Sequence, residues 1–127
     1  MLNNREKGDL GENVACEFIK RRGYSVISRN YRKKWGEIDI IAQKDDVLNF
    51  FEVKSVTKSL EVNSLKGYRP EENVNTFKLG QIRRMVRTFL AESAFHAETE
   101  FRFHVLSVYL DMKTRKGRVK WIKDVIL

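Results

Sequence analysis

The sequence predicts a single domain of the α/β class, and three observations support this prediction. Two stretches, near residues 10–22 and 76–93, place apolar residues at helical spacing. Segments rich in Ile, Val and Phe lie between and after them, as expected for strands. The chain has 127 residues, 42% of them hydrophobic, which is enough to close one core without a disulfide or a structural metal. We therefore expect residues 1–127 to form one compact domain.

The first half of the chain is expected to contain one helix and then three strands. The helix runs from Asp9 to Arg22, and Gly23 is a residue suited to end it. A polar connector, residues 31–35, separates the first strand from the second. The three strands cover residues 24–30, 36–43 and 47–55.

The second half begins with a polar segment, residues 56–75, that shows no clear periodicity. Connections of this length are uncommon unless they are functional or mobile. A second helix is expected from Thr76 to Ser93, with Arg84 and Arg87 on its outer face. Two strands, residues 100–111 and 117–126, follow and are joined by a basic loop.

The turn between the second and third strands sets the register of that hairpin. If the turn formers Asp45 and Asp46 make the loop, residue numbers of paired residues sum to 91, so Asp39 lies opposite Glu52. Opposed carboxylates have Cβ atoms about 4.5 to 5.5 Å apart and repel each other unless a cation lies between them. The same register places Glu37 opposite Lys54.

These residues predict a metal site that cleaves phosphodiesters. Magnesium prefers hard oxygen ligands, often one or two carboxylates, and it can activate water, neutralise phosphate charge and assist the leaving group. Asp39 and Glu52 meet that requirement. Lys54 shares a strand face with Glu52 and could hold the attacking water. Manganese is expected to substitute for magnesium.

The alternative is a solvated ladder of ion pairs on an exposed strand face, formed by the same charged residues. Against it, Ile41, Leu48 and Phe50 share that face and make it apolar.

Three further residues have two interpretations each. Glu12 lies beside the apolar stripe of the first helix and could point toward a cation, or it could simply favour the helix start. Lys78 and Gln81 lie at the edge of the second helix's stripe and could reach a phosphate, or they could be surface residues. His104 alternates within a strand and is expected to be structural rather than catalytic.

A formal charge of +8 favours a polyanionic partner, with nucleic acid first and a membrane surface second. Residues 31–35 interleave Tyr31 and Trp35 with cations, which suits backbone neutralisation and base stacking, although Trp35 could equally cap the core. The expected nucleic-acid contacts are Arg32, Lys33, Lys34, Lys58, Lys66, Arg69, Lys78 and Gln81.

The remaining composition argues for a cytoplasmic protein. Cys16 is the single cysteine, so no internal disulfide forms, and no Cys/His cluster has zinc spacing. No stretch approaches the roughly 18 apolar residues that a bilayer requires, and the start has no apolar signal segment. Whether two copies pair as a homodimer is left open.

With these residues in view, the chain resembles the small bacterial YraN-type family (UPF0102), grouped with the restriction-endonuclease-like, or PD-(D/E)xK, nucleases. The resemblance covers nearly the whole chain. It rests on Gly11-Glu-Asn-Val-Ala15, Arg29-Asn-Tyr-Arg32, Gly36-Glu-Ile-Asp-Ile-Ile-Ala42, Phe51-Glu-Val-Lys54, Lys78 and Arg102-Phe103.

The resemblance implies a mixed sheet flanked by helices in the order αβββαβ. It also implies that Asp39, Glu52 and Lys54 form the nuclease core, with Glu12 as an accessory catalytic carboxylate. Archaeal Holliday-junction resolvases share a similar core, so a branched DNA substrate is suggested by analogy.

Two positions depart from the family pattern. Val56 stands where an arginine commonly follows Glu-x-Lys, and His104 where an aspartate usually follows Arg-Phe. The first hypothesis is therefore a magnesium-dependent endodeoxyribonuclease. The second is a catalytically inactive nucleic-acid-binding module with the same fold, and a third is a domain whose basic face binds an acidic protein.

Overall fold

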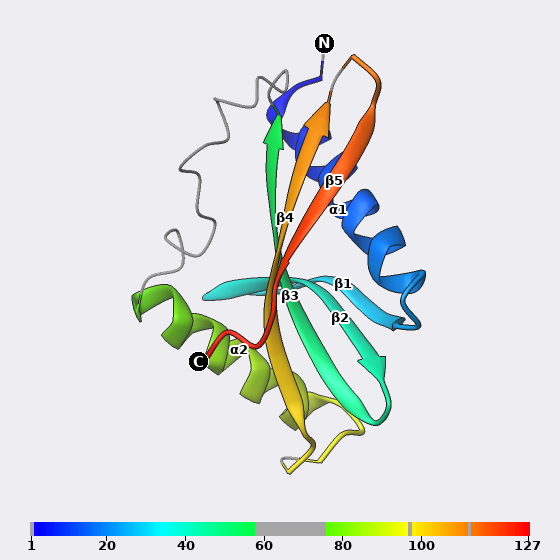
Figure 1. Cartoon of the computed structure of the whole chain (residues 1–127). Helices are drawn as coiled ribbons and strands as arrows, with labels where there is room; N and C mark the ends of the chain where they lie inside the picture. Colours follow the sequence, from blue (N-terminus) through cyan, green and yellow to red (C-terminus); the bar gives the residue numbers. More distant parts are fainter. Residues whose placement is uncertain (1, 58–75, 97, 112) are drawn as a thin grey trace.

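The computed structural model describes residues 2–57, 76–96, 98–111 and 113–127. It shows an α/β fold in which five strands form one mixed sheet with two helices packed on it (Figure 1). The order of elements contains the expected αβββαβ series and adds one strand, which is consistent with a restriction-endonuclease-like core. The elements are α1 (Asn4–Lys20), β1 (Ser25–Lys33), β2 (Gly36–Lys44), β3 (Val47–Thr57), α2 (Thr76–Glu92), β4 (Phe101–Asp111) and β5 (Lys116–Ile122).

The strands lie side by side in the order of the sequence, from β1 to β5. β3 and β4 pair in parallel, and every other neighbouring pair is antiparallel. A parallel pair needs a crossover connection, and α2 lies within the one that joins β3 to β4. This arrangement puts β3 at the centre of the sheet, with β2 on one side and β4 on the other.

Each face of the sheet carries its own apolar core. On one face, α2 packs through residues such as Met85 and Val86 against Leu48 and Phe50 of β3. On the other face, α1 packs through Ala15, Cys16 and Ile19 against Phe51 and its neighbours. The alternation of side chains along β3 therefore serves both cores at once.

Several element boundaries differ from those expected. α1 begins at Asn4 rather than Asp9, because the side chain of Asn3 accepts the backbone N–H of Glu6 at 2.8 Å and caps the helix. β1 continues to Lys33, so most of the expected polar connector is strand. At the other end, β5 runs from Lys116 and stops at Ile122.

The register expected for the β2–β3 hairpin is confirmed over five residue pairs, from Lys44↔Val47 to Ile40↔Phe51. Asp45 and Asp46 form the turn and both have positive φ, 51° and 63°. Two left-handed residues match the twist of a two-residue hairpin, and Asp tolerates that conformation better than most residues. Among the described residues, no helix combines the length and the hydropathy needed to cross a bilayer.

Candidate functional site

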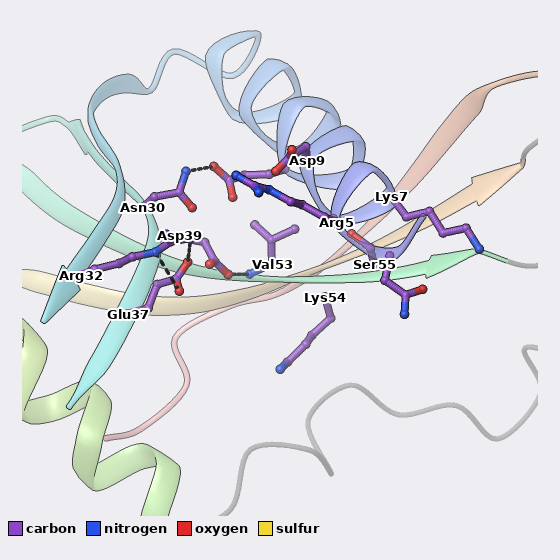
Figure 2. A pocket seen from close by; sticks show the side chains of 13 residues that line it. Arg5, Lys7, Asp9, Asn30, Arg32, Glu37, Asp39, Val53, Lys54 and Ser55 are labelled. Atoms are coloured by element: carbon purple, nitrogen blue, oxygen red, sulfur yellow. Dashed lines mark hydrogen bonds and ion pairs between the residues drawn. The ribbon is translucent and has the colours of Figure 1, made fainter. Parts of the chain in front are cut away.

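The candidate site lies where β2 leaves β3. The β2–β3 ladder stops at Ile40↔Phe51, whereas β3 stays paired with β4 as far as Thr57↔Leu110. Asp39 is the next residue of β2, and its Oδ2 accepts the backbone N–H of Val53 at 2.7 Å (Figure 2). A side chain thus takes the place of the main chain as the partner of β3 at this point.

Where β2 leaves β3, the side of the sheet on which its isoleucines pack also changes. Ile40 and Ala42 belong to the core under α1, while both Ile38 and Ile41 belong to the core under α2. Strict alternation would send Ile38 to the same side as Ile40. The strand therefore rotates around Asp39.

Burial and neighbouring acids together make Asp39 an unusual carboxylate. Burial, which is the largest effect, and the negative charges of Glu52, Glu37 and Glu12 together raise the pKa of Asp39 to about 7. The N–H of Val53 opposes this by stabilising the carboxylate. A cation placed here would relieve both the repulsion and the cost of burial.

On the α2 side of β3, Glu52 is held by two lysines. Its Oε1 accepts a hydrogen bond from Nζ of Lys78 at 2.6 Å and lies 3.2 Å from Nζ of Lys54. The Glu52 side chain is only 13% exposed, so this group is not the solvated ladder of the alternative interpretation. Lys78 thus joins the site, which sequence reasoning had left undecided.

The two lysines respond differently to this environment. Burial lowers the pKa of Lys54, and the adjacent Lys78 lowers it further, although Glu52 acts in the opposite direction. Burial also acts to lower the pKa of Lys78, but its contacts with Glu52 and Lys54 outweigh burial and the net shift is upward. Lys54 is therefore the ammonium that loses its proton more readily.

On the α1 side, Glu12 is buried and bound by two residues of β1. Its Oε1 accepts hydrogen bonds from Nε of Arg29 at 2.9 Å and from Nδ2 of Asn30 at 3.0 Å. Arg29 also binds Asn13, so one guanidinium fixes two side chains of the helix. Sequence reasoning did not assign Arg29 or Asn30 to the site. The signal was present in the quoted Arg29-Asn-Tyr-Arg32 segment.

Gly11 brings α1 close enough for Glu12 to reach the site. A Cβ on Gly11 would overlap the hydroxyl of Ser55 and lie 2.9 Å from its Cβ. Only glycine allows the helix to approach β3 this closely. The neighbouring Glu12 is thereby carried toward Asp39.

A cavity of about 500 Å³ opens between the first half of α1 and the strands. Its lining includes the acids Asp39, Glu12 and Glu37 and the cations Arg5 and Lys54. The side chains of Ser55 and Lys54 leave β3 on opposite faces, with Lys54 on the face away from α1 (Figure 2). Asp39 therefore lies between a cavity on the α1 side, which is lined by both acids and cations, and the Glu52 group on the α2 side.

The donor set fits magnesium better than a metal that needs a complete protein cage. In the described part of the chain, no group of three His, Cys, Asp or Glu side chains could hold a metal ion. Magnesium commonly takes one or two carboxylates and completes its shell with water and phosphate oxygens. Asp39 and Glu52 are the two residues that would hold it here.

Two expected pairings of the hairpin are absent, because the β2–β3 ladder stops at Ile40↔Phe51, before Asp39 could pair with Glu52 or Glu37 with Lys54. Glu37 instead lies opposite Arg32 of β1, and its Oε2 is 3.2 Å from Nε of that arginine. Arg32 also lines the cavity and keeps an exposed side chain.

The rest of residues 31–35 is largely occupied by internal contacts. Tyr31 packs edge-on against Phe89 of α2, and Trp35 packs against the same core, so neither ring is free to stack on a base. Lys33 is bound to Glu92 at 2.6 Å, which ties β1 to α2. Lys34 is exposed.

The remaining residues expected to contact nucleic acid lie outside residues 31–35. Gln81 is half-buried on α2. Lys58, Lys66 and Arg69 lie outside the described residues.

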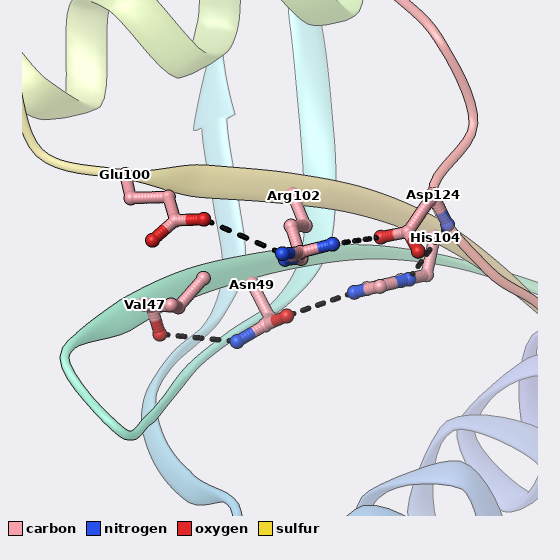
Figure 3. Close-up of polar contacts among 6 residues, drawn as sticks. All are labelled: Val47, Asn49, Glu100, Arg102, His104 and Asp124. Atoms are coloured by element: carbon pink, nitrogen blue, oxygen red, sulfur yellow. Dashed lines mark hydrogen bonds and ion pairs between the residues drawn. The ribbon is translucent and has the colours of Figure 1, made fainter.

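His104 is structural, in agreement with the sequence analysis. Its Nε2 lies 2.8 Å from Oδ1 of Asn49, and its Nδ1 accepts the backbone N–H of Asp124 at 3.2 Å (Figure 3). Burial lowers the pKa of His104 to about 4. The ring stacks on Phe51 and fixes the C-terminal segment to the sheet rather than joining the carboxylates.

The fold and the site define a small α/β protein with a carboxylate and lysine cluster at the point where two central strands separate. The model of the family described as "Uncharacterised protein family UPF0102" matches residues 11–108, which include every described residue of the cluster. The chain belongs to this family.

Relatives from several bacteria match almost end to end. A UPF0102 protein of Caldicellulosiruptor bescii is 34% identical over 97% of this chain and 98% of its own. One from Clostridium botulinum is 34% identical over 95% and 94%, and one from Dictyoglomus turgidum is 37% identical over 88% and 89%. The sequence analysis therefore identified the family correctly.

Proposed function

We propose that the chain is a magnesium-dependent endodeoxyribonuclease in which Asp39 and Glu52 hold the metal, with manganese able to replace magnesium. One observation carries the proposal. Among the described residues, Glu12 and Glu52 each form an ion pair with a cation, whereas Asp39 forms none and lies among the charges of three other acids. A buried carboxylate in that position is best explained by a divalent ion that binds there.

When bound, the metal supplies a Lewis acid for the phosphate and lowers the pKa of a bound water. Lys54 would position the attacking water and stabilise charge on the phosphate, because its ammonium is half-buried beside Glu52. Lys78 orients the Glu52 carboxylate through its short hydrogen bond. Glu12 supports the site from α1, where Arg29 and Asn30 fix its carboxylate.

The substrate we propose is DNA, with branched DNA included among the forms to be tested. The positive charge of the chain favours a polyanion. Arg32 at the rim of the cavity and the exposed Lys34 nearby are suited to contact phosphates.

A cleavage assay on labelled single-stranded, duplex and branched DNA, with magnesium or with manganese, tests the proposal. We expect wild-type cleavage to require the metal and to be lost in Asp39→Asn, a change that keeps an oxygen for the N–H of Val53. Asp45→Asn, in the exposed hairpin turn, is the matched control and should cleave normally. Metal-dependent cleavage that persists in Asp39→Asn would refute the assignment.

A second candidate function is nucleic-acid binding without turnover. It is favoured by the two lysines on Glu52, because they already compensate the charge of one proposed metal ligand. Calorimetry with magnesium separates the two functions. Magnesium binding that Asp39→Asn removes supports the nuclease, whereas salt-dependent DNA binding without metal uptake supports the binding module.

A further inference from the structure

The C-terminal hairpin carries a concentration of positive charge that the candidate site does not use. Residues 113–123 contain no Asp or Glu. All of their basic side chains are exposed, including those on β5, which forms one edge of the sheet. The basic residues are Lys113, Arg115, Lys116, Arg118, Lys120 and Lys123.

Apart from Lys113, which lies beside Asp111, these cations form no ion pair with a carboxylate in the part of the chain that the structure describes. The cations on the opposite edge of the sheet do form such pairs: on β1, Arg29 binds Glu12, Arg32 binds Glu37 and Lys33 binds Glu92. Edge strands often carry charge to prevent pairing with another chain. The two edges nevertheless differ, because β1 neutralises its cations internally and β5 does not.

Strand register places Arg118 and Lys120 on the same face of the sheet as Glu52 and Lys54, the face on which α2 packs. Val119 and Trp121 pack on the α1 side of the sheet, so Arg118 and Lys120 point to the other face. Lys120 lies opposite Ser107 of β4, which in turn lies opposite Lys54 of β3. Lys54 and Lys120 therefore stand in one row across the sheet, separated by a single buried serine (the arrangement of β3, β4 and β5 is visible in Figure 1).

The row also marks the limit of the apolar core on that face. One step toward α2, the corresponding row contains Val105 and Ile122 beside Glu52, and both apolar residues belong to the α2 core. One step away from α2, Arg118 lies opposite Tyr109. Charge replaces apolar side chains at the level of Lys54 and continues outward along β5.

We propose that Arg118 and Lys120, with Lys116 beyond them, bind the phosphodiester backbone of a nucleic acid and lead it to Lys54. This inference deepens the proposed function and rests on it for its direction, since the row of charge ends at the proposed catalytic lysine. The Cα atoms of alternate residues in a strand are about 6.6 Å apart, so the three β5 cations form a line. Neighbouring strands are about 4.8 Å apart, so the backbone of Lys120, two strands away, lies about 10 Å from that of Lys54. Such a line suits successive phosphates of one strand rather than a single small anion.

Binding of labelled DNA, measured by fluorescence anisotropy in EDTA over a range of salt concentrations, tests this surface without requiring cleavage. We expect Arg118→Gln/Lys120→Gln to weaken binding and to reduce the slope of log K against log salt by about 2 for duplex DNA. The matched control is Arg83→Gln/Arg87→Gln, which removes the same charge from exposed positions of α2. Equal losses in both double variants would show that only net charge matters, and no loss in either would show that Arg118 and Lys120 do not bind DNA; either outcome would overturn the proposal.

Anionic lipid vesicles provide a second comparison. If wild-type protein binds vesicles of phosphatidylserine through Arg118 and Lys120 but does not bind DNA, the surface recognises a membrane and the inference is wrong. If the double variant loses DNA binding while the wild type cleaves no substrate, the inference stands and the proposed nuclease fails. If the wild type cleaves and the double variant binds and cleaves equally well, the proposed nuclease stands and the inference about β5 fails.

Discussion

β3 has two halves with opposite chemistry, and their difference shows how this fold makes room for a site. From Val47 to Phe51 the strand is paired on both sides, with β2 and β4. From Glu52 onward it keeps β4 but loses β2. The paired half is almost wholly apolar, whereas the open half carries Glu52 and Lys54 and receives Asp39 from the departing strand.

Each half buries a titratable group, and the two groups are stabilised in different ways. Beside the paired half, His104 of β4 has both ring nitrogens within hydrogen-bond distance of a partner and stays neutral. Beside the open half, Asp39 accepts one N–H, and its charged neighbours are three acids and the cation Lys78. The paired half therefore completes its own polar contacts, and the open half leaves a requirement for positive charge.

The largest predicted effect is the loss of cleavage when one of the two carboxylates that flank Asp39, Glu52 or Glu12, is neutralised. If Glu52 is a metal ligand and Glu12 only supports the site, Glu52→Gln should reduce cleavage by about 10² to 10³-fold. Glu12→Gln should cost roughly 10-fold, as outer groups of metal sites do. Single-turnover cleavage rates measure both, with Glu17→Gln on the exposed side of α1 as the control. A larger loss in Glu12→Gln would reverse the two roles.

The packing of α1 against the open half of β3 should be the next most sensitive feature. Gly11→Ala introduces a Cβ into the space of the Ser55 side chain, and we expect it to lower the free energy of unfolding by about 3 kcal/mol. Urea denaturation provides the measurement. Gly8→Ala in the same helix has open space around it and should instead stabilise by about 0.5 to 1 kcal/mol.

A second variant separates overlap from other effects of the substitution. Ser55→Gly in the Gly11→Ala background should recover most of the lost stability, because it removes both atoms that the new Cβ would meet. No recovery would show that the helix does not depend on this close approach.

His104, beside the paired half of β3, predicts a pH dependence of stability that is opposite in sign to that of Asp39 beside the open half, because the pKa of His104 is lowered and that of Asp39 is raised. Because the pKa of His104 is near 4 in the folded protein and about 6.5 when unfolded, the unfolded chain binds the proton first as the pH falls. The contribution of His104 to stability should be fully present above pH 6.5 and be lost as the pH falls from 6.5 to 4, by an amount on the order of 3 kcal/mol.

Denaturation midpoints across this pH range, in wild type and in His104→Gln, measure that contribution. The variant should lack this part of the pH dependence. His96→Gln, at the exposed second histidine, should keep it. A pH profile that is identical in wild type and His104→Gln would contradict the neutral, buried state of the ring.

The smallest effect is expected for the arginine that fixes Glu12. Arg29→Gln removes the cation from a buried carboxylate but leaves the hydrogen bond from Asn30, so a loss of about 1 kcal/mol is expected. Arg32→Gln, which breaks the more exposed pair with Glu37, should change stability by less than about 0.5 kcal/mol. Thermal denaturation can compare the two, and equal losses would show that the Glu12 pair is no better protected from solvent.

The sequence predicted the features that depend on local pattern. The turn formers Asp45 and Asp46 were sufficient to place Phe51 opposite Ile40, which brings Asp39 to the Glu52 end of β3. Helical periodicity likewise located α2, whose observed end differs by one residue from the expected Ser93. These features follow from spacing along the chain, which the sequence contains directly.

Features that depend on contacts between distant segments were missed or left open. Residues 31–33 were expected in a polar connector, yet Tyr31 and Lys33 belong to a strand because α2 supplies partners for both. Lys78 could not be assigned until α2 was placed beside Glu52. The close approach at Gly11 depends on Ser55, and no local pattern reports such a pair.

The parallel pairing of β3 with β4 has a consequence for how the molecule folds. β1, β2 and β3 are joined by short turns and can assemble early, as can β4 with β5, but joining the two groups must bring together residues far apart in the chain. Such non-local closure slows folding. Phe50 and Phe51 each contact groups from β4 or the segments after it, so until that closure the nascent chain exposes both rings and risks aggregation.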